Sequence, residues 1–146
     1  MRLSDEALTD ALLDELEPLA LFHHAELFGD ETPFFFNRPL LTALAQADAM
    51  VAVLLRDGPK IVGYCGFMIG PMMSRPETCA IDAGLFIDRA HRGGPWAAMM
   101  VLKAINRCRD RGVRYVQIQM PAKAPGHALM KRLGFTQTDI VFGKEV

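Results

Sequence analysis

The chain has 146 residues, the length of a single domain, and it can bury a core without disulfide or metal staples. With 51% apolar and 23% charged residues, and no apolar run of the ~18 residues that a membrane span needs, the composition excludes disorder, collagen, coiled coil and a transmembrane segment. The net charge is −1, but nine of the 17 acidic residues lie between residues 5 and 31, and ten of the 16 basic residues between residues 89 and 132. We therefore expect one domain over residues 1–146 whose C-terminal half holds an anionic ligand.

The N-terminal third is predicted to be helical. Apolar residues at helical spacing predict a first helix over residues 5–16, with Ser4 as its N-cap. A second helical piece is expected over residues 18–28, because proline is well tolerated in the first turn of a helix. After a loop, residues 39–47 are expected to form a short helix. The predicted inward face of this short helix consists of Leu40, Leu41 and Leu44.

From residue 50 onward the pattern changes to strands. Residues 50–55, 61–68 and 78–87 predict three consecutive strands, and the second is apolar on both faces, which is typical of a central strand. Turn residues separate them at 57–59 and 71–76. Consecutive strands joined by short turns pair in the antiparallel direction.

The last third alternates helices and strands. Helices are predicted over residues 95–111 and 125–133, and strands over residues 115–120 and 140–144. A strand–helix–strand step makes its two strands parallel through a right-handed crossover. We therefore expect an α/β (α+β) fold with a mixed, twisted, partly antiparallel sheet and helices on both faces. A doubly wound dinucleotide fold is disfavoured, because three strands follow one another without a helix.

The most informative segment runs from a strand through a glycine-bearing turn into a helix, over residues 85–97. Free N–H groups at a helix N-terminus attract anions, and Gly93 and Gly94 let a phosphate approach the backbone. A plain strand-to-helix turn with Pro95 in the first helical turn is the alternative. A nucleotide-binding domain that uses this turn for another phosphate is a weaker option. Nucleic acid is disfavoured as a partner, because the basic region offers few aromatic side chains for stacking.

Several motifs in this half of the chain resemble the GNAT acetyltransferase family. The family's acetyl-CoA loop reads Arg or Gln, two residues, Gly, one residue, and Gly or Ala. Residues 92–97 fit this frame except that Pro95 stands at the first glycine position. Further segments similar to family motifs, in the same order, are Val62-Gly63-Tyr64, Leu85-Phe86-Ile87, Arg111-Gly112-Val113 and residues 128–135. The resemblance covers residues 50–146 and is greatest to small phage and bacterial GNAT proteins.

The resemblance implies that the sheet splays into a V between the strands at 78–87 and 115–120, with acetyl-CoA in the opening. Residues 1–48 would form a helical acceptor-side segment, and residues 49–146 the acetyl-CoA-binding core. The implied cofactor-binding residues are Leu85, Phe86, Ile87, Arg92, Gly93, Gly94, Trp96 and Ala97. The implied function is an N-acetyltransferase that transfers acetyl from acetyl-CoA to a primary amine by direct attack. The acceptor would be a small molecule or a protein, and no metal and no membrane would be involved.

Three residues are the candidate catalytic groups for accepting the amine proton. Asp82 comes first, because it is the only acidic residue in the strands bordering the cleft, and burying a charge is costly. It faces solvent unless a one-residue bulge reverses its orientation. Glu26 and His24 come second, and they would act together only if the helix has ended before them. His91 is expected in the phosphate-side loop, and His127 as polar lining.

Two departures from the family pattern support an alternative function. Pro95 has no N–H to donate to a phosphate. Met130 stands where the family often has a tyrosine that protonates the departing thiolate. We expect Met130 to face the cleft, because Leu129 and Leu133 take the core-facing positions. The alternative is a catalytically weak or inactive acyl-CoA-binding or regulatory module on the same fold.

The remaining singled-out residues are expected to be structural. Three cysteines, Cys65, Cys79 and Cys108, have no metal-like spacing and predict buried, reduced thiols in a cytoplasmic protein. The run Phe34–Phe36 could line an acceptor pocket, form the contact of a homodimer, or pack in the core.

Overall fold

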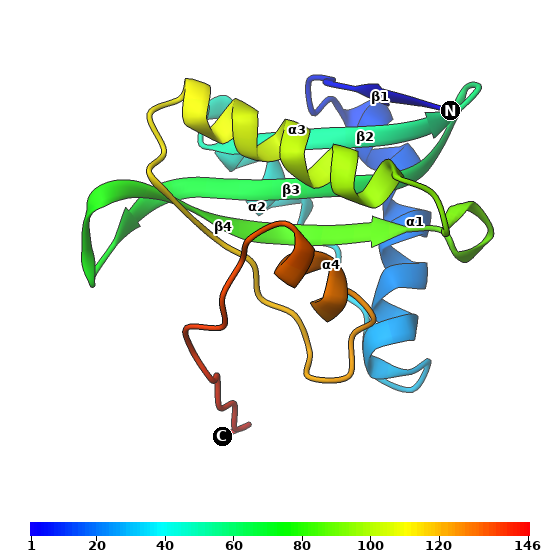
Figure 1. Cartoon of the computed structure of the whole chain (residues 1–146). Helices are drawn as coiled ribbons and strands as arrows, with labels where there is room; N and C mark the ends of the chain where they lie inside the picture. Colours follow the sequence, from blue (N-terminus) through cyan, green and yellow to red (C-terminus); the bar gives the residue numbers. More distant parts are fainter.

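The computed structural model describes residues 1–146, and a five-stranded sheet of order β1-β2-β3-β4-β5 lies at its centre (Figure 1). The strands are β1 (Arg2–Ser4), β2 (Met50–Asp57), β3 (Lys60–Met72), β4 (Arg75–Ile87) and β5 (Tyr115–Gln117). The pairs from β1 to β4 are antiparallel, and β5 runs parallel to β4. The crossover between the parallel pair contains a helix, as expected from the chain order. The predicted mixed α/β fold is therefore confirmed.

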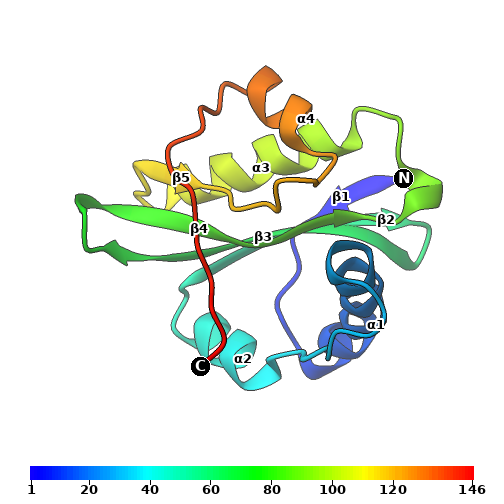
Figure 2. The ribbon, with the colours of Figure 1, turned by 90° about the horizontal axis from the view of Figure 1, so that it is seen from below.

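The helices cover both faces of the sheet (Figure 2). They are α1 (Asp10–Phe28), α2 (Arg38–Gln46), α3 (Trp96–Asp110) and α4 (His127–Arg132), with a short 3₁₀ turn, η1 (Arg89–His91). Helices α1 and α2 lie on one face, and α3 and α4 lie on the other. No helix combines the length and the apolar character needed to cross a membrane.

The core consists of two layers separated by the sheet. Successive side chains of β2 point alternately into the two layers. Val53 and Leu55 lie in the layer under α3, whereas Leu54 lies in the layer under α1. The larger layer is built around Phe67 of β3 and the apolar face of α3. Leu12, Leu16 and Leu19 of α1 form the smaller layer with Leu54, Ile61 and Phe86. Helix α1 is thus packed directly onto β2, β3 and β4.

The N-terminal segment differs from the two predicted helices. Residues 2–4 form an edge strand on β2, and Ser4 is not a helix cap. Helix α1 begins later, where the Thr9 hydroxyl accepts the N–H of Leu12 at 3.2 Å. It then continues through Pro18, which removes one helical hydrogen bond. Burial of its leucines against the sheet outweighs that loss, so the two expected pieces form one helix.

Three further expectations about local structure are wrong in whole or in part. Helix α2 has no fully buried residue, and of its leucines predicted to face inward Leu40 is 45% exposed, whereas Leu41 and Leu44 are half-buried. The strand predicted over residues 115–120 pairs only over its first three residues, because the chain then leaves β4. Residues 140–144 form no strand, and Ile140, Val141 and Phe142 are exposed. An apolar run becomes a strand only where a neighbouring strand is available to pair with it.

Candidate functional site

The sheet opens between β4 and β5. The two strands pair only where residues 79–81 face residues 115–117. Immediately beyond this point, Oδ1 of Asp82 accepts the backbone N–H of Gln119 at 2.6 Å. Asp82 is one residue beyond the last paired residue of β4, and Gln119 is two residues beyond the last paired residue of β5, so a side chain replaces the β4 backbone as hydrogen-bond acceptor there. The predicted V-shaped opening is present, and Asp82 lies at its apex.

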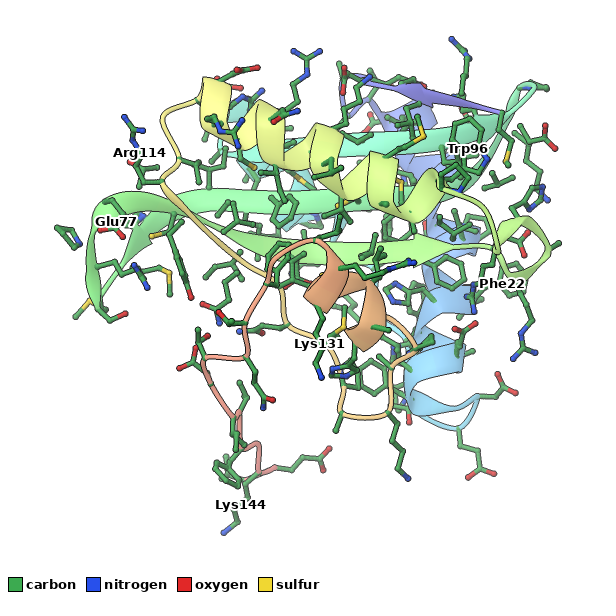
Figure 3. All side chains as sticks on the ribbon, viewed as in Figure 1. Phe22, Glu77, Trp96, Arg114, Lys131 and Lys144 are labelled. Carbon is green, nitrogen blue, oxygen red and sulfur yellow. The ribbon has the colours of Figure 1, made fainter.

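A cleft of about 1170 Å³ fills this opening. Its walls come from the end of α1, from β4 after Ile81, from the loop before α3, and from the segment between β5 and α4. Trp96 at the start of α3 and Lys131 on α4 both line it (Figure 3). The cleft is therefore bordered by elements from both halves of the chain.

The loop between η1 and α3 presents backbone N–H groups that have no partner. The residues whose N–H donates no hydrogen bond within the chain are Gly93, Gly94, Trp96, Ala97 and Ala98. Gly93 has a φ of +100°, which only glycine adopts readily. Several free N–H groups at the N-terminus of a 15-residue helix favour an anion. The loop therefore suits a phosphate even though Pro95 contributes no donor.

Arg92, a predicted phosphate ligand, is engaged on the α1 side of the cleft. Its Nε donates to the carbonyl oxygen of Ile87 at 2.7 Å, and its Nη2 donates to Oε2 of Glu26 at 2.8 Å. The guanidinium also lies 5.3 Å from the centre of the Phe86 ring. The hydrogen bond from Arg92 holds the pKa of Glu26 below its ordinary value. Glu26 is therefore a stable carboxylate, and a phosphate contact of Arg92 stays a prediction.

Strand β4 contains a one-residue bulge directly after Asp82. Asp82 and Gly84 oppose adjacent residues of β3, so Ala83 has no partner. Asp82 lies on the face of Ala80, under α3, by ordinary two-residue alternation. The bulge reverses the alternation after Asp82, so Phe86 packs under α1. Burial raises the pKa of Asp82, and the hydrogen bond from the backbone partly offsets this. Asp82 lines the cleft, but the bulge follows it and does not set its orientation.

His24 and Glu26 are not brought together. Glu26 lines the cleft, but His24 does not. Its Nε2 donates to the carbonyl oxygen of Thr32 at 3.0 Å, and its ring packs against Phe28 and Phe34. Helix α1 continues to Phe28, so two residues spaced by two project in different directions. A catalytic role for His24 stays a prediction with no support from its position.

Met130 lines the cleft, as expected, but it is also a core residue. It is only 8% exposed and packs in the larger core layer, where it also forms part of the cleft wall. Leu129 and Leu133, predicted to face the core, are only half-buried at its margin. Helix α4 has six residues, which is too short for apolar periodicity to fix its rotation.

The other residues singled out in the sequence lie in the core, at the cleft or on the surface. All three cysteines are buried and free, as predicted. His91 and His127 both line the cleft. Phe36 packs against the smaller core layer, whereas Phe35 is 78% exposed.

His23 is the site residue that sequence reasoning misses. Its Nδ1 lies 2.7 Å from the hydroxyl oxygen of Tyr64, and its ring stacks on Phe86 with centroids 4.8 Å apart. It lines the cleft beside Glu26. Burial lowers its pKa from the ordinary value of 6.5. The available signal is helical spacing, because residues 12, 16, 19 and 23 follow one stripe that faces the sheet.

A split mixed sheet with free N–H groups at its strand-to-helix loop defines an acetyltransferase-type α/β domain. The sequence profile of the Acetyltransferase (GNAT) family matches residues 12–135, and the chain belongs to this family. A search of curated proteins found no match.

Solved structures show the same fold at low sequence identity. A transcriptional regulator from Bacillus halodurans superposes with a TM-score of 0.78 at 16% identity, covering 99% of this chain and 100% of that one. A glucosamine-6-phosphate N-acetyltransferase from Arabidopsis thaliana gives 0.71 at 15% identity, covering 99% of both chains. An aminoglycoside acetyltransferase from an uncultured soil metagenomic sample, in complex with sisomicin, gives 0.76 at 14% identity, covering 99% and 96%. The fold therefore extends over essentially the whole chain.

Proposed function

We propose that this protein is an N-acetyltransferase that transfers acetyl from acetyl-CoA to a primary amine by direct attack. The observation that carries the proposal is one continuous cleft joining the free N–H groups of Gly93, Gly94, Trp96 and Ala97 to the opening between β4 and β5. A phosphate-bearing ligand with a long arm matches that combination. Acetyl-CoA supplies the activated thioester, whose sulfur leaves with the electron pair of the broken C–S bond.

The residues present fit such a ligand. The N–H groups of Gly93, Gly94, Trp96 and Ala97 would hold the pyrophosphate. The β4 edge at residues 85–87 has no strand partner on the β5 side, so its remaining backbone groups would bond the amides of the pantetheine arm. The half-buried Trp96 adds apolar cover at the loop. These assignments agree with the basic character of residues 89–132.

The acceptor would enter from the α1 side. The end of α1 contributes His23, Glu26, Leu27 and Phe28 to the cleft. Of the predicted carboxylates, Glu26 is neutralised by Arg92, and only Asp82 has a pKa raised toward neutrality. Asp82 is therefore the better base of the two. Two structural neighbours are an aminoglycoside acetyltransferase and a glucosamine-6-phosphate N-acetyltransferase, so aminoglycosides and amino-sugar phosphates are reasonable members of an acceptor panel.

Two measurements test the proposal. Isothermal titration should show binding of acetyl-CoA in preference to ATP, and a CoA-release assay over a panel of primary amines should show turnover. Binding without turnover on any amine would favour the acyl-CoA-binding or regulatory module instead. Preferred binding of ATP would assign the loop to a different phosphate ligand.

A further inference from the structure

Three aromatic side chains from three different elements meet on the α1 side of the cleft. His23 comes from α1, Tyr64 from β3 and Phe86 from β4. The Tyr64 hydroxyl lies 2.7 Å from Nδ1 of His23, and the imidazole stacks on the Phe86 ring at an interplanar angle of 22°. The ring of His23 is thus fixed by a hydrogen bond at one nitrogen and by stacking on one face.

We infer that His23 is the catalytic residue that takes the proton from the acceptor amine, and that Tyr64 positions its ring. The inference rests on the proposed N-acetyl transfer. As the nitrogen lone pair forms the N–C bond to the acetyl carbon, the C–S bond breaks with its electrons on sulfur. The nitrogen gives up one proton to Nε2 of His23. That proton then goes to the thiolate, so that an amine and a thioester yield an amide and a thiol.

The geometry leaves Nε2 as the free nitrogen of the ring. Nδ1 is occupied by Tyr64, while no group of the chain bonds Nε2 of His23, which lines the cleft. For Nε2 to act as a base in the neutral ring, it must be unprotonated, and the ring hydrogen must then be on Nδ1. The phenolic oxygen of Tyr64 can accept a hydrogen bond from that Nδ1–H. The same oxygen accepts that bond after Nε2 is protonated, so the ring keeps its orientation through the step.

The two carboxylates are less well placed for this step. Asp82 lies on the opposite face of β4 and holds the N–H of Gln119. Glu26 is bound to Arg92 at 2.8 Å. His23 instead lies where the acceptor-side helix meets the cleft, and its neutral form is favoured there by burial.

The charges around His23 come from two elements. On its own helix, Glu26 raises the pKa of His23 and His24 lowers it; from the loop before α3, Arg92 also lowers it. Tyr64 faces His23 from β3, and burial raises the pKa of Tyr64, so that its hydroxyl stays neutral. The balance lowers the pKa of His23, so the ring is an unprotonated base at neutral pH.

Nitrogen NMR of the histidine rings tests the inference without any turnover. We expect the Nδ1–H tautomer for His23 and a titration midpoint below its ordinary value of 6.5. In Tyr64→Phe the tautomer preference should be lost. Finding the hydrogen on Nε2 in the wild-type protein would overturn the inference, because that nitrogen could then only donate.

Kinetics of paired variants give the second test. His23→Asn should lower kcat by roughly 100- to 10,000-fold, abolish the acidic limb of the pH–rate profile, and leave acetyl-CoA binding and the melting temperature close to wild type. His24→Asn is the matched control, because it makes the same substitution at the next residue, which does not line the cleft. Tyr64→Phe should shift the acidic limb with a smaller loss of kcat. An equal loss in His24→Asn, or a full rate in His23→Asn, would overturn the assignment.

The two proposals fail in different ways. If the wild-type protein binds acetyl-CoA but releases no CoA with any amine, the proposed function fails. The tautomer of His23 measured by NMR then still decides whether its Nε2 is unprotonated and able to accept a proton. If wild-type turnover is normal and only Asp82→Asn abolishes it, acetyl transfer stands and the proton acceptor is Asp82.

Discussion

Arg56 links helix α1 to the sheet. Its side chain is only 9% exposed, and it donates to both oxygens of Glu6 at 2.7 and 2.8 Å and to Glu15 of α1 at 3.0 Å. It also donates to the carbonyl oxygen of Pro59 in the β2–β3 turn. One buried cation therefore ties together the chain before α1, the helix itself and a turn of the sheet.

Arg56→Met removes the charge and keeps most of the apolar stem. Breaking a buried ion pair by losing one partner costs about 3–5 kcal/mol. Glu6 is 29% exposed and Glu15 is 47% exposed, so both carboxylates regain water and the cost falls to roughly 2–3 kcal/mol. For a domain of this size we expect a melting temperature lower by roughly 5–10 °C.

The difference should depend on pH in a defined direction. The hydrogen bonds from Arg56 are the first cause that lowers the pKa of Glu6 from 4.5 to about 2. A carboxyl group whose pKa is depressed by folding contributes stability above pH 4.5 and loses it as the pH falls toward 2. Melting curves of wild type and Arg56→Met should therefore converge as the pH falls through that window.

Arg38→Met is the matched control. Arg38 binds Asp14 and Glu17 of the same helix, but it is 34% exposed, so its loss should lower the melting temperature much less than the loss of Arg56. An equal loss of stability in the two variants, or an Arg56→Met deficit unchanged at pH 3, would refute the reasoning.

Three further substitutions test the site and its walls. Gly84→Ala should lower the free energy of unfolding by about 1–3 kcal/mol and reduce the turnover measured as CoA release, because φ is +144° and a Cβ would lie 3.0 Å from Cε2 of Tyr64. A melting temperature and a rate that match wild type would contradict this. Met130→Tyr should lower the melting temperature through overpacking of about 1–3 kcal/mol, since Met130 is buried between the core and the cleft; an unchanged melting temperature would mean that the larger ring extends into the cleft without disturbing the core. Gly94→Val should weaken acetyl-CoA binding in isothermal titration, because its Cβ would meet Trp96 at 3.2 Å, and parental affinity would place the phosphate elsewhere.

Local signals account for most of the correctly predicted elements. The central strands are predictable because continuous apolar runs end at turn residues, and the loop before α3 because glycines precede a helical pattern. Strand β1 has three residues and no signal of its own, so only its pairing with β2 creates it. Residues 140–144 show the opposite case, since their apolar pattern meets no strand to pair with.

The candidate site likewise contains residues that local sequence patterns indicate and residues that they do not. Asp82 is identifiable as an acid in an apolar strand, whereas the expected bulge lies directly after it and does not set its orientation. The cluster of His23, Tyr64 and Phe86 joins residues 41 and 63 positions from the histidine along the chain, and no local pattern connects them. Only the packing of α1 on β3 and β4 brings the three side chains together.

The unpaired edge of β4 beyond Ile81 has a consequence for solution behaviour. An open strand edge with free backbone groups can recruit a strand from another molecule, which starts aggregation. The bulge at Ala83 interrupts this edge, and a bulge is one of the devices by which proteins discourage such pairing. A ligand lying along the rest of the edge would complete the protection, so the same cleft that serves chemistry would also control the colloidal stability of the protein.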